Sequence, residues 1–409
     1  MRHDMAVVTG LGVVDASAWG IDGAAAAFAN PSPTPVEVDR SAGYHQRSRS
    51  RCALLVDPKP QQQWLIPLAA RRMSAASRFA VCAAKMAVEN AGLEPDDLAG
   101  RTAVVLATAY GAADFSERIL RQIFLDGPNT VSPALFTESV ANAPTAQIAL
   151  AMDARGTNVT VTQRQAGVPV ALSRALVELQ TGRAERVLVG VVDEMTPLLH
   201  AILDRFRGLA QPDHDGVERA RPFDRRRNGW LAAEGAVVAL LETESSARRR
   251  HAPVLARLLA AGSAFDPKSP RNGWGRDPAL LASVLREFLH RVRRGPATVD
   301  RVVCSACGHR GADRLEARLL RAIFEESELP PILAPAATSG AYGGSLLAAA
   351  ILAAAGKPFG PTPGFREPDP EVGVTPYDGR SLPPPLCTLL TACAAGGAAG
   401  WALFEAPEE

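Results

Sequence analysis

The chain has 409 residues, enough to bury one very large core or, more commonly, the cores of two domains. Its composition, 47% hydrophobic and 21% charged with Gly and Pro spread throughout, excludes disordered, collagenous and coiled-coil classes. Because 44 Lys and Arg balance 43 Asp and Glu, the net charge of +1 predicts no affinity for nucleic acid or for a membrane surface.

Apolar runs and cysteines indicate the cellular compartment of the protein. The longest apolar run, residues 346–355, is about half as long as a membrane span, and no basic segment followed by an apolar one opens the chain. Six cysteines are too sparse for a disulfide framework: Cys52, Cys82, Cys304, Cys307, Cys387 and Cys393. We therefore expect a cytoplasmic protein with reduced thiols and no membrane attachment.

Apolar segments predict a repeated strand, helix, strand order in the first half of the chain. Strands are expected at residues 5–14, 102–107, 158–161 and 186–191. Helices are expected at residues 77–91 and 170–179, because apolar residues share one helical face and a glycine follows each segment. The pattern indicates a layered α/β fold.

The same order begins again after Glu244. Strands are expected at residues 254–259, 301–305, 386–392 and 400–405, and helices at residues 279–294, 311–325 and 346–355. Residues 357–385 are rich in Pro and Gly, which favours an extended connector on the surface. We expect two similar halves, residues 1–244 and 245–409, each with one buried sheet.

One segment is long and specific enough to indicate a family. Residues 221–236 (RPFDRRRNGWLAAEGA) closely resemble the Arg-Pro-Phe-Asp, Arg-x-Gly-Phe and Gly-Glu-Gly-Ala segment of β-ketoacyl synthases. Other segments follow in the family's order: VVTGLGVV at 7–14, VSPALF at 131–136, RVLVGVVDE at 186–194 and PTPGFREPDPE at 361–371. The resemblance covers essentially the whole chain. It implies a thiolase-like fold, with two duplicated α/β halves in five αβαβα layers, and an obligate dimer.

The family's nucleophile has been replaced. An active ketosynthase carries a Cys at the tip of a tight turn before a buried helix, where amides and the helix dipole favour the thiolate. Counting back from Gly182 and from Gly190 places this position at residue 165, within TQRQAGVP at 162–169. Residue 165 is Gln, whose amide cannot form a thioester. The alternative is that the register slips and Gln165 is an ordinary helix-cap residue.

The family's two catalytic His and its Lys are also absent. The His-Gly-Thr motif corresponds to residues 305–307, so Ser305 stands for the first His. The Lys-x-x-Thr-Gly-His motif corresponds to residues 335–340, so Pro335 replaces Lys and Gly340 replaces the second His. The Gly-Phe-Gly-Gly-Thr-Asn loop, which helps to form the oxyanion hole, reads AAGGAA at 394–399. The resemblance therefore implies that no catalytic residue is intact.

This combination resembles the chain length factor, or ketosynthase-β subunit, of bacterial type II polyketide synthases. The resemblance implies a heterodimer with an active ketosynthase that sets polyketide or polyene length, with the acyl carrier protein bound mainly through the partner. Two alternatives stay open. One is a stand-alone malonyl-carrier decarboxylase of the loading type, which also carries Gln but needs the His pair. The other is an independent condensing enzyme that uses a group such as Cys307.

Residues 111–128 resemble the helix of chain length factors that lies at the dimer interface. The match places three residues that gate the polyketide tunnel at Ala113, Ser116 and Leu120. Their i, i+3, i+7 spacing puts them on one helical face. Because Ala113 and Ser116 are small, we expect a comparatively long or wide tunnel. The alternative is that they only pack against the partner's helix.

Other candidate sites are weaker. Cys304, Cys307 and His309 form half of a zinc pattern without a second pair, and GLG at 10–12 lacks the spacing of a dinucleotide fingerprint. We therefore expect neither a metal nor a cofactor. Four histidines are expected at the solvated surface: His200, His214, His251 and His290. Arginine clusters are either solvated faces or carrier contacts: residues 71–72, 225–227, 248–250 and 291–294.

Overall fold

The computed structural model describes residues 4–325 and 328–408. Its main sheet is built from two blocks of five strands. The first block contains β1 Ala6–Asp15, β4 Thr102–Ala107, β5 Asn158–Val161, β6 Arg186–Asp193 and β8 Gly235–Thr243. The second contains β9 Ala256–Phe265, β10 Arg301–Cys304, β11 Ile332–Leu333, β12 Cys387–Cys393 and β13 Ala398–Glu405.

Both blocks have the same topology. The first block has the order β1-β8-β6-β4-β5, and the second has the order β9-β13-β12-β10-β11. When the strands of each block are counted along the chain, both blocks have the spatial order 1-5-4-2-3. The blocks touch where β1 pairs antiparallel with β9 over residues 6–8. The duplicated α/β halves expected from the sequence are therefore present in the fold. The boundary at residues 244 and 245, which falls where α9 (Glu244–Arg249) begins, stays a prediction.

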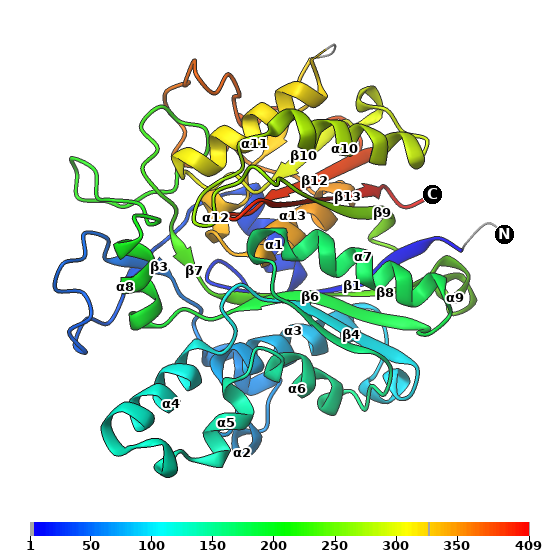
Figure 1. Cartoon of the computed structure of the whole chain (residues 1–409). Coiled ribbons are helices and arrows are strands. Elements are labelled where there is room, and N and C mark those ends of the chain that lie inside the picture. The colour runs from blue at the N-terminus through cyan, green and yellow to red at the C-terminus, as the bar shows by residue number, and fades with distance from the viewer. Residues whose placement is uncertain (1–3, 326–327, 409) are drawn as a thin grey trace.

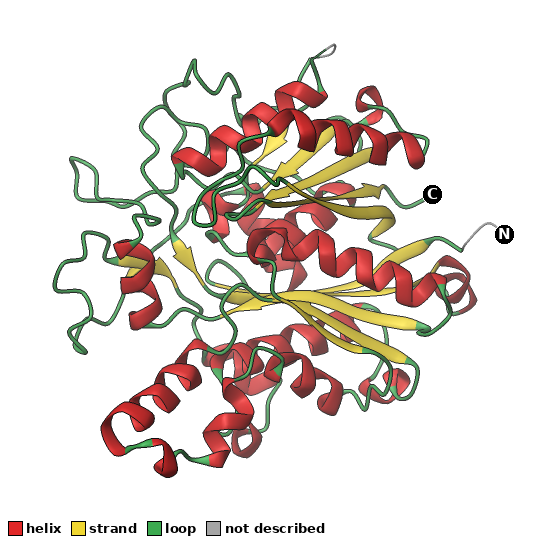
Figure 2. Ribbon diagram, in the orientation of Figure 1, coloured by secondary structure: helices red, strands yellow, loops and turns green. Residues whose placement is uncertain are grey.

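Helices cover both faces of each block (Figures 1 and 2). The first block is covered on its outer face by α3 (Ala75–Asn90) and α6 (Ala143–Ala151), and the second by α10 (Pro278–Arg291) and α11 (Arg310–Ile323). Helices α7 (Gly167–Gln180) and α13 (Gly343–Ala354) lie between the blocks in one shared core. The predicted five-layer αβαβα arrangement is confirmed.

The sequences of these elements explain their places. Helix α13 is apolar all round and buried along nearly its whole length, as expected of a helix between two sheets. Helix α11 instead buries a leucine-rich face together with Asp313 and Glu316, and leaves Arg314, Arg318 and Arg321 exposed. Strand β1 carries Gly10 and Gly12 because α3 passes very close: an added Cβ would lie 1.9 Å from the carbonyl oxygens of Ala87 and Ala83.

The remaining elements lie mainly at one end of the layers, with the termini at the other (Figure 1). A small sheet is formed by β2 Val36–Glu37, β3 Cys52–Leu54 and β7 Ala232–Ala233. The other helices are α1 Gly20–Ala29, α2 Pro67–Ala70, α4 Ala113–Asp126, α5 Pro133–Ser139, α8 Pro197–Arg205 and α12 Ala336–Ser339. Short 3-10 helices span Lys59–Gln63, Pro95–Leu98, Pro128–Thr130, Arg164–Ala166 and Pro296–Thr298.

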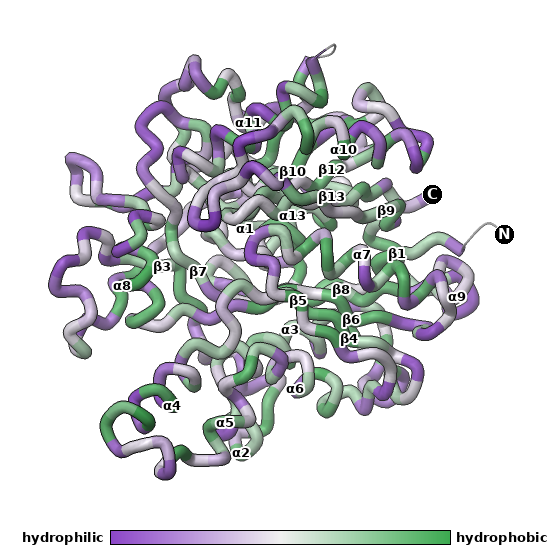
Figure 3. Tube along the Cα trace, viewed as in Figure 1, coloured by the Kyte–Doolittle hydropathy of each residue, from purple (hydrophilic) through white to green (hydrophobic). Residues whose placement is uncertain are grey.

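The connector at residues 357–385 contains no helix or strand and follows the surface, as expected. Its Tyr377 backbone N–H donates to the carbonyl oxygen of Ile332, and Val372 and Val374 are buried against the second core. Hydropathy along the trace shows polar connectors around an apolar interior (Figure 3). Within the described ranges, none of the helices combines the length and the apolar character that crossing a membrane requires.

Candidate functional site

Gln165 lies in the 3-10 turn η4 (Arg164–Ala166), directly before α7. Arg164 has a φ of 49°, so the turn enters the helix through a left-handed residue. The Gln165 Oε1 atom is buried and accepts no hydrogen bond from the described residues. The side chain that occupies this turn is therefore a neutral amide with no group that can attack a carbonyl.

The turn brings Gln165 to the place where the two halves of the chain meet. Turn η4 contacts β12, β13 and α13. Ser305 follows β10, the neighbour of β12, and its hydroxyl accepts a hydrogen bond from the backbone N–H of Cys393 at the end of β12. Gly340 precedes α13. The three positions that would hold Cys, His and His thus belong to segments that converge at one end of the sheets.

Ser305 is held by a buried carboxylate. Its backbone N–H donates to Oε1 of Glu316 (3.0 Å), its hydroxyl donates to Oε2 (2.6 Å), and the hydroxyl of Thr391 donates to Oε1 (2.6 Å). Burial raises the pKa of Glu316 to about 7, although these hydrogen bonds act in the opposite direction. The Ser305 hydroxyl is therefore engaged in holding its own loop together.

Gly340 adopts a conformation that leaves no room for a side chain. Its φ is 83° and its ψ is 172°, a combination that L side chains rarely adopt. An added Cβ would lie 2.3 Å from the Cβ of Ala233 and 3.2 Å from Cδ1 of Leu54. Pro335 is the residue before α12 and has no side-chain hydrogen-bonding group. Neither position can therefore polarise a thioester carbonyl.

Cys307 and His309 have structural surroundings. Cys307 is buried against Ala312 and Ala336, and burial together with nearby Asp313 raises the pKa of its thiol well above the usual value. His309 caps α11: its Nδ1 accepts hydrogen bonds from the backbone N–H groups of Gly311 (3.2 Å) and Ala312 (3.4 Å). The thiol is thus kept neutral, and the imidazole is used as a cap.

The zinc alternative depends on the same residues. In the described part of the chain, no three His, Cys, Asp or Glu side chains are grouped as a metal would require. The rings of Trp230 and Trp274 lie on His309, each with its centroid 5.4 Å from that of the imidazole. Burial and the charge of Arg227 lower the pKa of His309.

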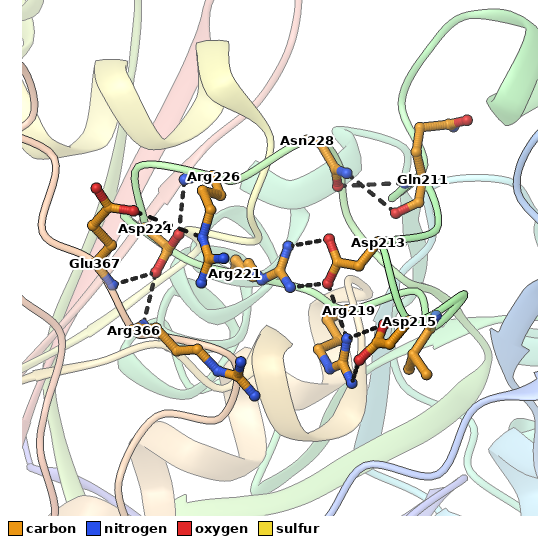
Figure 4. A network of polar contacts seen from close by, with 11 residues as sticks. Gln211, Asp213, Asp215, Arg219, Arg221, Asp224, Arg226, Asn228, Arg366 and Glu367 are labelled. Carbon is orange, nitrogen blue, oxygen red and sulfur yellow. Dashed lines mark hydrogen bonds and ion pairs between the residues drawn. The ribbon is translucent and has the colours of Figure 1, made fainter.

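The family-like segment at 221–236 is fixed by a polar network (Figure 4). Both terminal nitrogens of Arg221 bond to the carboxylate of Asp213, one at 2.6 Å. Asp224 accepts the backbone N–H groups of Arg366 and Glu367, each at 2.7 Å. These bonds tie the segment to the connector, which explains why charged residues recur in it.

The three expected tunnel residues lie at the start and middle of α4, which protrudes with α5 from the layers (Figure 1). Ala113 and Ser116 are half-buried, and Leu120 is exposed. The Ser116 hydroxyl lies 2.9 Å from the carbonyl oxygen of Ala112 and 3.0 Å from that of Ser139, at the end of α5. A cavity of 470 Å³ lies along the other side of α4, from which Asp114, Phe115, Glu117 and Arg118 line it.

One surface expectation is wrong. His200 is fully buried, whereas His214, His251 and His290 are exposed as expected. The Nδ1 atom of His200 lies 3.1 Å from Nε2 of His45, and the Nε2 atom of His200 lies 3.2 Å from the carbonyl oxygen of Cys52. Burial lowers the pKa of both imidazoles. Residues 39–51 fold over α8, and the sequence around His200 carries no sign of this cover.

The layers, the duplicated strand order and the convergent turn define a thiolase-like α/β protein. The model of the β-ketoacyl synthase N-terminal domain matches residues 36–247, and the chain therefore belongs to the β-ketoacyl synthase family. Relatives in Streptomyces glaucescens include the ketoacyl synthase β subunit of the tetracenomycin polyketide synthase, 31% identical over 73% of each chain. The α subunit of the same synthase is 28% identical over 79% of each chain.

Solved structures agree on the fold. The ishigamide ketosynthase/chain length factor matches with a TM-score of 0.89 and 24% identity, covering 100% of both chains. A β-ketoacyl synthase from Burkholderia phymatum matches with a TM-score of 0.88 and 20% identity, covering 99% of this chain and 100% of the other. These matches span both halves of the chain.

Proposed function

We propose that this chain is the non-catalytic chain length factor of a β-ketoacyl synthase heterodimer, and that it helps to set the length of a polyketide or polyene. The observation that carries the proposal is the amide of Gln165 in the turn before α7, where the family places its acyl-accepting thiol. An amide accepts no acyl group by transfer from a thioester. Condensation would then depend on the thiol of the partner.

The rest of the site supports the same proposal. Ser305 is bonded to Glu316, and a side chain at Gly340 would collide with Ala233, so neither His function has a substitute at its own position. The loading-type decarboxylase alternative requires that His pair to stabilise an enolate. The alternative of a condensing enzyme built on Cys307 requires a thiolate, which burial opposes.

The partner is suggested by the relatives and by an exposed apolar surface. Both subunit types of one polyketide synthase are similar to this chain, and one solved relative is described as an acyl carrier protein bound to its type II ketosynthase. Large apolar side chains of α4 and α5 are exposed: Leu120, Phe124, Leu125 and Phe136. Strand β5 ends the first block, leaving an unpaired edge. We assign this surface to the active ketosynthase, through which the carrier would mainly bind.

A reconstitution tests the proposal. The purified chain alone, given malonyl-carrier and acyl-carrier, is expected to release no CO₂ and to form no covalent acyl adduct, as measured by intact-protein mass spectrometry. With the ketosynthase that copurifies with it, carrier-bound polyketide chains are expected. Decarboxylation by the chain alone would support the loading-type alternative instead. Condensation by the chain alone would support the independent enzyme, and a Cys307→Ala variant would show whether that thiol is used.

A further inference from the structure

A groove of 830 Å³ lies between the loop that covers α8 and the end of α8 itself. Four arginine side chains line it: Arg47 and Arg49 from the loop, and Arg205 and Arg207 from the end of α8 and the residues after it. The other lining groups are largely amides and hydroxyls, including Gln46, Ser48, Gln211 and Asn228. Helix α8 is at the end of the molecule opposite the chain termini (Figure 1).

The positive charge of this groove is not neutralised within the protein. None of the four guanidinium groups has a carboxylate within ion-pair distance among residues 4–325 and 328–408. Asp204 is the only carboxylate in the lining. Its oxygens accept the backbone N–H of Arg49 (2.9 Å), the hydroxyl of Ser50 (2.9 Å) and the amide of Gln211 (3.1 Å).

A neighbouring groove shows the ordinary arrangement. Six arginines line that groove, and four of them are paired: Asp213 pairs with Arg219 and Arg221, and Glu367 pairs with Arg225 and Arg226 (Figure 4). These four arginines therefore stabilise the protein's own loops. The groove beside α8 differs because none of its four guanidinium groups pairs with an acidic side chain of the described residues, although like charges at close range repel one another.

The loop that carries Arg47 and Arg49 is anchored on both sides of these residues. Before these two residues, the guanidinium of Arg40 donates to the carbonyl oxygen of His45 (2.9 Å). The imidazole of His45 is at hydrogen-bond distance from that of His200. After them, Ser50 is buried and bonded to Asp204. The backbone is thus held in place while the guanidinium groups stay exposed, an arrangement that lowers the entropic cost of binding an anion.

We propose that this groove binds a small ligand that carries at least two phosphate groups. A guanidinium group offers two parallel N–H donors to a phosphate, and several unpaired guanidiniums in one groove match a diphosphate better than a single anion. The volume is in the range of small-molecule sites. The polar lining favours recognition of the phosphates themselves. This inference is independent of the chain-length role, because none of these residues belongs to the catalytic positions or to the tunnel helix.

Inorganic pyrophosphate is the direct probe. Titration calorimetry on the full chain, alone and in complex with its ketosynthase, is expected to show saturable binding. Arg47→Ala and Arg205→Ala should each weaken binding about 10- to 100-fold, the range for one lost hydrogen bond to a charged group. Lys at either position should lose less, because it keeps the charge without the fork. As a matched control, Arg293→Ala removes an exposed arginine after α10 and should leave the affinity unchanged.

Two comparisons complete the test. Coenzyme A and a nucleoside diphosphate share the diphosphate with the probe, so equal affinities would assign recognition to that group, and tighter binding of one would identify the source of the ligand. Sulfate at equal ionic strength should bind much more weakly. The proposal is overturned if no diphosphate saturates the protein at millimolar concentration, or if sulfate binds equally well. It is also overturned if Arg293→Ala weakens binding as much as Arg47→Ala while the thermal unfolding of both variants is unchanged.

Discussion

Two buried carboxylates of α11 hold the loop that contains Ser305 and Cys307. Glu316 binds Ser305 and Thr391, and Asp313 accepts the backbone N–H groups of Phe223 and Cys307. Burial raises the pKa of Asp313 to about 6 and that of Glu316 to about 7. Because these carboxylates bind backbone and hydroxyl groups of their own loops, their contribution to stability can be measured without an activity assay.

The pH dependence of stability should reveal Glu316. Its folded pKa of about 7 exceeds the ordinary 4.5, so between these values the folded state keeps a proton that the unfolded state releases. Stability must therefore fall as pH rises from 4.5 to 7, by about 1.4 kcal/mol per pKa unit. In Glu316→Gln, urea unfolding at pH 5.5 and pH 8 should show a smaller difference than in the wild type. Glu287→Gln, an exposed position on α10, should keep the wild-type difference; an equal slope in both variants would contradict the role of Glu316.

Gly340 gives a second test at the scale of one residue. Gly340→Ala combines an unfavourable φ of 83° with a Cβ contact of 2.3 Å to Ala233, so the free energy of unfolding should fall by about 2–4 kcal/mol. Gly182→Ala is the matched control, since its φ is 65° and nothing lies within 4 Å of the added Cβ. It should cost only about 1 kcal/mol. Equal losses in chemical denaturation would show that the contact with Ala233 is relieved by movement.

Sequence reasoning reached the identities at these positions but not their surroundings. Counting from Gly182 and Gly190 gives the same position for Gln165, although only Gly182 follows the end of an element, α7, and Gly190 lies inside β6. The contact of Ser305 with Glu316 could not be predicted, because the sequence does not show that the Glu316 side of α11 is buried against the loop of Ser305. His200 was misplaced for the same reason: its cover comes from residues 39–51, far away in sequence.

At the scale of elements, length alone did not decide what could be predicted: the four-residue strand β5 was predicted with its exact bounds, whereas the nine-residue strand β8 was missed. The central helix α13 and the strands β4 and β6 lie close to the predicted ranges. Each of them is a continuous apolar run, which is detectable in the sequence. The strands β2 and β7, two residues each, have no periodicity to detect. Their small sheet is determined by tertiary contacts. The loop between β2 and β3 contains Arg47 and Arg49, which line the groove beside α8.

Helix α4 is the element on which product length should depend. Ala113→Trp adds a large ring to the face that carries Ser116, which would narrow a tunnel at that face and shorten the carrier-bound chains made by the reconstituted pair. Arg118→Trp places the same ring on the opposite face of α4 and should leave chain length unchanged. Mass spectrometry of the carrier-bound products measures both. An unchanged distribution in Ala113→Trp, with normal yield, would exclude the gating role.

At the scale of the whole molecule, the two halves repeat one topology but end differently. The sheet of the first half ends at β5. The α4 and α5 pair of this half protrudes from the layers (Figure 1) and has exposed apolar side chains. Phe124 is 81% exposed and Phe136 is 61% exposed. Aromatic side chains at this density on one surface are typical of protein interfaces. This surface is therefore the place where the proposed ketosynthase partner would bind.

Charge substitutions on this surface should separate the pair without unfolding the chain. Phe124→Asp and Phe136→Asp are each expected to weaken association with the ketosynthase at least tenfold, because aromatic residues dominate interface energies and a buried unpaired carboxylate adds a desolvation cost. Thermal unfolding of the isolated chain should change little, since both side chains are exposed there. Leu386→Asp is the control: Leu386 is 72% exposed, next to β12 in the second half. Analytical ultracentrifugation of coexpressed pairs gives the result. If Leu386→Asp dissociates the pair and the α4 and α5 variants do not, the partner binds another face and the tunnel cannot include Ala113.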